Sequence, residues 1–183
     1  MHVNKSITDL KFNVAQLLRE EVGSRRDYDF AEDRLPLDDD EMELRGLTGR
    51  VRFIRTVSGV LGDVSGGGTV EMECIRCLTR AAQPVEFHFQ DEFHSRIEVN
   101  TGVALPKPDE EDPFYIDESH MVDLGEAIRE YTLLELPMQP LCRPDCRGLC
   151  PICGKDRNVD PCTCADTGGD DRFGILRSLL TEE

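Results

Sequence analysis

Residues 142–154 read Cys142-Arg-Pro-Asp-Cys-Arg-Gly-Leu-Cys-Pro-Ile-Cys-Gly154, and a polar loop then leads to Cys162-Thr-Cys164. Six of the eight cysteines lie in this stretch. Cys150 and Cys153 have two residues between them, a spacing at which two thiolates face one tetrahedral cation across a tight turn. Gly154 follows, where such a turn often needs the positive φ that glycine adopts at low cost. The pattern is that of a zinc knuckle, and it predicts bound zinc.

The knuckle supplies two ligands, and the sequence leaves the other two open. Cys162 and Cys164 close the site if the chain turns between them, and Cys146 is the substitute if it does not. We therefore predict one zinc ion per chain, held by Cys150 and Cys153 with two of Cys146, Cys162 and Cys164. On this interpretation Cys142 is not needed for metal binding. A site of four thiolates with no open position is structural and not catalytic.

Disulfides are the alternative use of these cysteines. The first 22 residues include Lys5, Asp9, Arg19 and Glu20 and contain no long apolar run, so we expect no secretory signal and a cytoplasmic location. A cytosolic chain keeps its thiols reduced, which favours metal over disulfides.

Length and charge bound the remaining possibilities. A chain of 183 residues fits an α+β sheet domain over residues 1–140, with an acidic loop at about 100–118, and a cysteine-rich zinc module over 141–183. No apolar stretch is long enough for a bilayer, so we expect no membrane role. The net charge of −16 disfavours nucleic-acid binding by the whole surface and fits a basic partner.

Apolar and polar residues alternate from Leu44 to Ile97, which predicts an antiparallel sheet with one buried face. The run Gly66-Gly67-Gly68 is predicted to be a turn between two strands. The expected core residues of the sheet are Val51, Phe53, Val70, Met72, Val85, Phe87 and Phe89.

Helical spacing predicts three further elements. One helix is expected to run from about Asn13 to Val22, one from Asp123 to just before Pro137, and a short one from Asp170 to Leu180. The acidic run Asp27–Arg45 is interpreted as a solvated connection or a strand edge.

A second pair of thiols, Cys74 and Cys77, lies at the end of one predicted strand. Its spacing allows chelation or a redox dithiol. A thioredoxin-type site should open a helix, whereas another strand follows here, so a redox enzyme is disfavoured. Cys74 shares the buried face of its strand and is interpreted as a core residue. A second metal site would need two more ligands, from His88, His94 or the spare cysteines downstream.

Two groups of cationic residues stand out in this acidic chain. Arg45, Arg50, Arg52 and Arg55 form a stripe on the predicted sheet, for which cross-strand pairing with Glu71 and Glu73 is the favoured explanation. The cysteine module carries the second group. The candidates for RNA contact in the two groups are Arg50, Arg52, Arg147 and Lys155.

Three features together resemble the YceD-like family of bacteria and plastids. They are Cys74-Ile-Arg-Cys-Leu78, the helix end Leu-Glu-Leu-Pro137, and Asp145-Cys-Arg-Gly-Leu-Cys-Pro-Ile-Cys-Gly154 with the later Cys-x-Cys pair. The resemblance covers about residues 27–180. It implies a role in accumulation of large-subunit ribosomal RNA, hence in ribosome biogenesis, and it carries over no catalytic residue. Some family members lack the C-terminal cysteines, so zinc is expected to be a stabilising addition.

The sequence therefore predicts an α+β fold with a curved antiparallel sheet, flanking helices and a C-terminal zinc module. We expect a non-enzymatic assembly factor without a small-molecule substrate. Its expected partner is a large-subunit precursor, ribosomal RNA or a basic ribosomal protein. The acidic excess favours the protein, with Asp109–Glu118 as the contact. The alternative is a zinc-ribbon regulatory adaptor in transcription or translation, and a thiol oxidoreductase using Cys74 and Cys77 ranks third.

Overall fold

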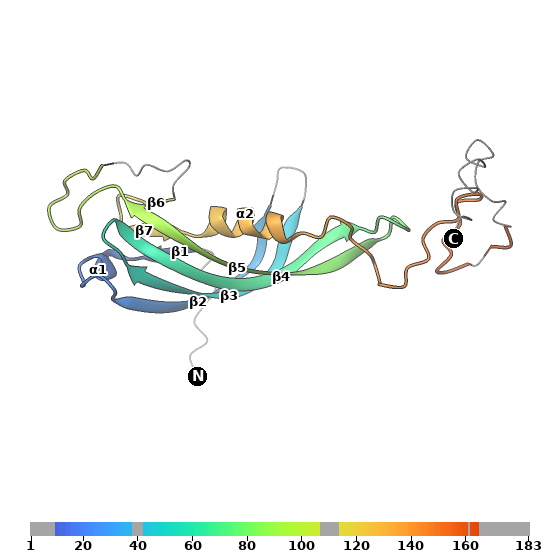
Figure 1. Ribbon diagram of the computed structural model, residues 1–183, viewed down its shortest axis with the longest axis horizontal. Coiled ribbons are helices and arrows are strands. Elements are labelled where there is room, and N and C mark those ends of the chain that lie inside the picture. Colours follow the sequence, from blue (N-terminus) through green and yellow to red (C-terminus); the bar gives the residue numbers. More distant parts are fainter. Residues whose placement is uncertain (1–9, 38–41, 107–113, 161, 165–183) are drawn as a thin grey trace, which may run out of the picture.

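A long, curved sheet forms the body of the protein in the computed structural model, which describes residues 10–37, 42–106, 114–160 and 162–164 (Figure 1). The elements in chain order are β1 (Lys11–Asn13), α1 (Ala15–Leu18), β2 (Arg25–Pro36), β3 (Glu43–Arg55), β4 (Gly59–Glu73), β5 (Arg80–Ser95), β6 (Tyr115–Ile116), β7 (Met121–Asp123) and α2 (Gly125–Glu135).

The main sheet has the strand order β2-β3-β4-β5-β6, and β1 pairs with β7 in a separate two-stranded sheet. The first four strands of the main sheet are antiparallel neighbours, as predicted. The short strand β6 runs parallel to β5, with His94 opposite Tyr115, so the sheet is mixed and not purely antiparallel. A parallel neighbour needs a crossover of a dozen or more residues, and the long segment between β5 and β6 supplies it. The acidic strand β2 lies at an edge of the sheet.

The prediction of a turn at Gly66-Gly67-Gly68 is wrong, because all three glycines lie inside β4. A Cβ on Gly67 would lie 2.5 Å from the Val85 carbonyl oxygen, and one on Gly68 would lie 2.7 Å from the Arg45 carbonyl oxygen. The glycines therefore allow neighbouring backbones to approach closely, where the pairing of β3 with β4 is irregular.

The core lies between the sheet and α2, which crosses its concave face (Figure 1). Tyr131 of α2 stacks on Phe89 of β5, with the ring centroids 4.2 Å apart and the planes at 4°. Phe53 and Phe93 continue the packing edge to face. The predicted sheet core is confirmed, since its members are buried and only Met72 is partly exposed.

The helices differ from their predicted bounds. The first ends at Leu18, four residues early, because the Arg19 and Glu20 N–H groups donate to carbonyls three residues back and close the last turn tightly. The second starts at Gly125, whose N–H donates to the Asp123 carboxylate, and ends just before Pro137, as predicted. The third predicted helix lies outside the described residues. Neither described helix is long and apolar enough to cross a membrane.

Candidate metal centres

The predicted knuckle at Cys150 is a tight turn closed by two backbone hydrogen bonds. The Gly154 N–H donates to the Cys150 carbonyl at 2.9 Å, and the Cys150 N–H donates to the Lys155 carbonyl at 2.8 Å. Gly154 has a φ of +71°, in the left-handed region that glycine adopts without strain. The turn directs the Cys150 and Cys153 thiols to the same side.

A second turn of the same construction joins β4 to β5 at Cys74–Thr79. The Leu78 N–H donates to the Cys74 carbonyl at 2.8 Å, and the Cys74 N–H donates to the Thr79 carbonyl at 3.0 Å. Leu78 stands where the first knuckle has Gly154, and its φ is +61°. Cys74 and Cys77 therefore sit on a knuckle of the kind that presents two thiolates to one metal ion.

Four cysteines meet at this turn, and we call them the hairpin-tip cluster: Cys74, Cys77, Cys142 and Cys146. Their sulfurs all lie within 4.8 Å of one another. The Cys74–Cys146 sulfur distance is 3.8 Å and the Cys77–Cys142 distance is 3.5 Å. A tetrahedral Zn²⁺ with Zn–S bonds of about 2.3 Å has sulfur–sulfur edges of about 3.8 Å, so the spacing fits a metal ion. The same distances are far longer than a disulfide bond of about 2.05 Å.

The other four cysteines form the terminal cluster: Cys150, Cys153, Cys162 and Cys164. Their sulfurs also lie within 4.8 Å of one another. Cys153 and Cys164 are exposed, whereas three of the four thiols of the hairpin-tip cluster are buried. Of the five predicted ligands, the structure thus brings four together and places Cys146 in the hairpin-tip cluster. Cys142, which the sequence left without a role, lies there too.

The thiols of the hairpin-tip cluster have unequal acidities. Burial raises the pKa of Cys74, but backbone N–H groups of Cys142, Arg76 and Cys77 outweigh it and lower the pKa to about 6. Burial and the neighbouring thiols raise the pKa of Cys142 to about 12. Four thiols this close cannot all ionise beside one another, because like charges repel. A divalent cation among them would remove that obstacle.

The terminal cluster repeats this contrast. Backbone N–H groups of Cys153 and Ile152 lower the pKa of Cys150 to about 6. Hydrogen bonding with Cys153, together with burial, raises the pKa of Cys164 to about 12. Each cluster thus contains at least one thiol whose pKa is lowered and at least one whose pKa is raised, so that the second kind would need a neighbouring cation to ionise. An all-sulfur donor set suits zinc, and four ligands leave no open position on a tetrahedral ion.

Hydrogen bonds fasten the segment after α2 to the hairpin tip around the first cluster. The Ile75 N–H donates to the Pro140 carbonyl at 3.0 Å, and the Arg76 guanidinium donates to the Cys146 carbonyl at 2.9 Å. The Leu149 N–H returns a bond to the Arg76 carbonyl at 2.9 Å. Gly148 is required there, because a Cβ would lie 2.8 Å from that carbonyl oxygen.

Asn158 supports the same cluster from outside. Its side-chain amide Nδ2 donates to the Cys146 sulfur at 3.4 Å, and its Oδ1 accepts the Arg147 N–H at 2.8 Å. The same oxygen accepts an N–H of the Arg143 guanidinium at 2.8 Å. Partners of this kind orient metal ligands. The sequence contained one signal for the hairpin-tip cluster. It has two Cys-x-x-Cys motifs and eight cysteines in all, which is enough for two sites of four ligands each.

The candidate RNA-contact arginines of the sheet are engaged in ion pairs. Arg50 bonds Asp29 at 2.9 Å, and Arg52 bonds Asp27 at 2.7 Å. The predicted cross-strand pairing therefore occurs, but for these two it involves acids of β2, because Asp29 and Asp27 lie directly opposite Arg50 and Arg52 in the register of β2 with β3. Arg45 does pair with Glu71, at 3.6 Å.

The candidate contacts of the cysteine segment differ from each other. The Lys155 ammonium bonds Asp160 at 2.8 Å. The Arg147 guanidinium is exposed and forms no ion pair with a described residue.

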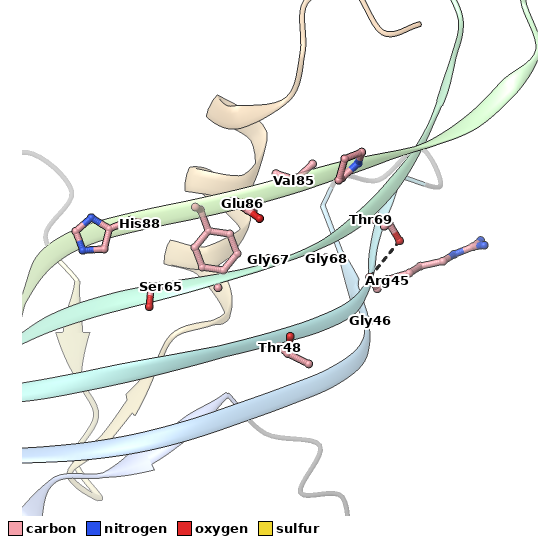
Figure 2. Close-up of a pocket in the computed structure, with 13 residues that line it drawn as sticks. Arg45, Gly46, Thr48, Ser65, Gly67, Gly68, Thr69, Val85, Glu86 and His88 are labelled. Atoms are coloured by element: carbon pink, nitrogen blue, oxygen red, sulfur yellow. Dashed lines mark hydrogen bonds between the residues drawn. The ribbon is translucent and has the colours of Figure 1, made fainter. Parts of the chain in front are cut away.

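A groove of about 800 Å³ crosses the face of the sheet above Gly67 (Figure 2). Thr48 and Ser65 line it with hydroxyl groups, and Arg45 and His88 stand at its two ends. Arg45 is paired with Glu43 and Glu71, and His88 bonds Asp63 at 2.9 Å. Both ends of the groove are therefore occupied by side chains that already have acidic partners.

Comparison with known proteins identifies relatives for the part of the chain that contains the two cysteine clusters. The family model described as large ribosomal RNA subunit accumulation protein YceD matches residues 63–180. An uncharacterised protein of Mycobacterium leprae is 35% identical over 112 residues, which is 57% of this chain and 48% of that protein. A protein of Mycobacterium tuberculosis strain H37Rv is 38% identical over 91 residues, 49% of this chain and 41% of that protein.

A more distant relative has a descriptive name. The chloroplastic large ribosomal RNA subunit accumulation protein YCED homolog 1 of Zea mays is 25% identical over 118 residues, 52% of this chain and 40% of that protein. The chain thus spans less than half the length of these relatives. No solved structure matches it.

Proposed function

The chain belongs to the YceD family of large ribosomal RNA subunit accumulation proteins, and from this premise we propose that it is a non-enzymatic factor in assembly of the large ribosomal subunit. The observation that carries the proposal is the family match over residues 63–180, which includes most of β4, all of β5 and α2, and all eight cysteines. The proposed partner is a precursor of the large subunit, through its ribosomal RNA or a basic ribosomal protein.

We propose that each cysteine cluster holds one zinc ion. Cys74, Cys77, Cys142 and Cys146 would bind the first, and Cys150, Cys153, Cys162 and Cys164 the second. Zinc would cross-link the chain segments that carry its ligands. It would have no coordination position open for a substrate or water, because four thiolates complete its tetrahedral shell. The saturated shell supports a binding protein over a metalloenzyme, and over a dithiol oxidoreductase that needs Cys74 and Cys77 free.

Ribosomal RNA in a deletion strain tests the proposal. We expect the ratio of large-subunit to small-subunit ribosomal RNA to fall, and gradient profiles to lose large subunits. Restoring the gene should correct both. A normal ratio with altered expression of particular genes would favour the alternative of a zinc-ribbon regulatory adaptor.

A further inference from the structure

The hairpin tip and the segment fastened to it form a lobe, residues 74–79 and 141–160, which lies beyond the end of the sheet (Figure 1). This lobe has five cationic residues and three acidic ones, within a chain whose net charge is −16. Cationic side chains therefore outnumber carboxylates at this end of the molecule, before the thiolates of a filled metal centre are counted.

Two arginines of the lobe are available to a ligand. The guanidinium groups of Arg147 and Arg157 are exposed and form no ion pair with a described residue. Their backbones are adjacent, because the Arg157 N–H donates to the Gly148 carbonyl at 3.0 Å. Arg50 and Arg52 of β3, by contrast, are paired with the acidic residues Asp29 and Asp27. An anionic partner would meet free charge on the lobe and paired charge on the sheet.

Exposed apolar side chains lie on the turn whose backbone bonds the segment that carries these cations. Ile75 is 50% exposed and Leu78 is 61% exposed, on the turn that packs against Gly148. Leu78 holds a left-handed backbone that costs a non-glycine residue roughly 1–2 kcal/mol. Its exposed side chain recovers little of that cost by burial. The left-handed backbone belongs to the turn that presents Cys74 and Cys77, so the feature available to a ligand is the exposed apolar side chain and not the strain.

Free guanidinium groups beside exposed apolar groups match the chemistry of unpaired RNA. Phosphates bind the cations, and unstacked bases lie against apolar surfaces or guanidinium planes. Duplex RNA buries its base faces and would use only the cations. We propose that the lobe binds single-stranded RNA, with Arg147 and Arg157 contacting phosphates and Ile75 and Leu78 receiving an unpaired base.

The acidic sheet does not prevent this binding. The Debye length at physiological salt is about 8 Å, so acids farther than this along the sheet are screened from the lobe, whereas the exposed Glu73 adjoins it. Two filled four-thiolate centres would each carry a net charge of −2 and together outweigh the lobe's excess of cationic side chains. Binding therefore depends on the exposed guanidinium groups and not on the net charge, because backbone N–H groups bond the Cys74 and Cys150 sulfurs. Two phosphate contacts predict a shallow salt dependence, with a logarithmic slope of about −1.4 for single strands.

Fluorescence anisotropy with the purified zinc-loaded chain tests the inference. The probe is a labelled 20-nucleotide RNA of mixed sequence, free of secondary structure, compared with the same RNA annealed to its complement. Arg147→Gln with Arg157→Gln should weaken single-strand binding at least tenfold. The matched control, Arg50→Gln with Arg52→Gln, changes the net charge equally and should alter binding less than twofold. Leu78→Gly keeps the backbone of the turn and should reduce the preference for single strands over duplex.

Zinc content and circular dichroism establish that each variant is folded, and Arg147→Lys with Arg157→Lys should retain most of the binding. Equal losses in the two glutamine pairs, equal binding of duplex, or no binding by the wild-type chain would overturn the inference. Capture of a basic ribosomal protein without RNA binding would overturn it in favour of the other partner class. The inference rests on the proposed function, from which it takes RNA as the partner, yet one experiment can refute the inference without refuting the proposed function. A deletion strain with a lowered ratio of large-subunit to small-subunit ribosomal RNA, together with no RNA binding in vitro, would refute only the inference.

Discussion

Replacing Cys142 with serine should cost the protein one zinc ion and much of the stability of its sheet. The hairpin-tip cluster joins Cys77 to Cys142 across 65 residues. In the chain-entropy treatment of cross-links, closing a loop of that size stabilises the folded state by about 4 kcal/mol. For a domain of this size each kcal/mol shifts Tm by about 2–4 °C, so we expect Tm to fall by roughly 8–16 °C.

Cys164→Ser is the matched control, because it removes a ligand from the cluster that closes no long loop. The terminal cluster lies wholly within residues 150–164 and links no strand of the sheet. This variant should also lose one zinc ion, while Tm of the sheet changes by less than about 2 °C. Both variants have the same chemistry, so the difference between them isolates the long cross-link.

Elemental analysis and thermal unfolding followed by far-ultraviolet circular dichroism measure the two quantities. The wild-type chain, purified under reducing conditions, should contain two zinc ions and each single variant one. Equal falls in Tm for the two variants would refute the cross-link argument. A wild-type content of one zinc, unchanged by Cys142→Ser, would restore the simpler prediction made from the sequence.

Three further changes test other parts of the structure. Gly154→Ala places a Cβ on a left-handed turn and should destabilise the terminal cluster by about 1–2 kcal/mol, seen as faster zinc release to a chelator while the other zinc is kept. Gly67→Val pushes a side chain against a backbone carbonyl of β5 and should destabilise the sheet by about 1–3 kcal/mol in urea unfolding; an unchanged midpoint would contradict the close approach. Burial raises the pKa of Glu92, but hydrogen bonds from Ser58 and Thr56 outweigh burial and lower the pKa below 4.5. The Glu92 carboxylate therefore stabilises the folded state at pH values above its unfolded-state pKa, and this contribution is lost as pH falls through the lowered folded-state pKa. Glu92→Gln should therefore be less stable than wild type near neutral pH, and the difference should shrink below about pH 4.

The sheet could be predicted because its signal is local. Alternation of period two along β3, β4 and β5 places Val51, Phe53 and Phe87 on one face, and burial on that face follows directly. The three glycines of β4 could not be interpreted correctly, since a glycine run is equally compatible with a turn and with close strand packing. The parallel strand β6 has two residues and carries no periodic signal of its own.

The assignment of cysteines to centres depends on contacts that no local pattern records. Cys150 and Cys153 could be recognised because both ligands lie on one turn. Cys142 and Cys146 carry no such mark, since their partners lie on the turn between β4 and β5 and only the folded chain brings them together. The ion-pair partners of the sheet arginines likewise depend on the fold and not on a local sequence pattern. Pairing of Arg50 with Asp29 depends on which strand lies beside β3.

The long separation within the hairpin-tip cluster also has a consequence for the chain during its synthesis. At about 5–20 residues per second, the 65 residues from Cys77 to Cys142 take roughly 3–13 s to make. Throughout that interval the hairpin presents two thiols that have no protein partners, and two thiolates hold zinc far more weakly than four. If this centre binds zinc as proposed, the complete set of four ligands would form late in the life of the nascent chain, once Cys142 and Cys146 have been made.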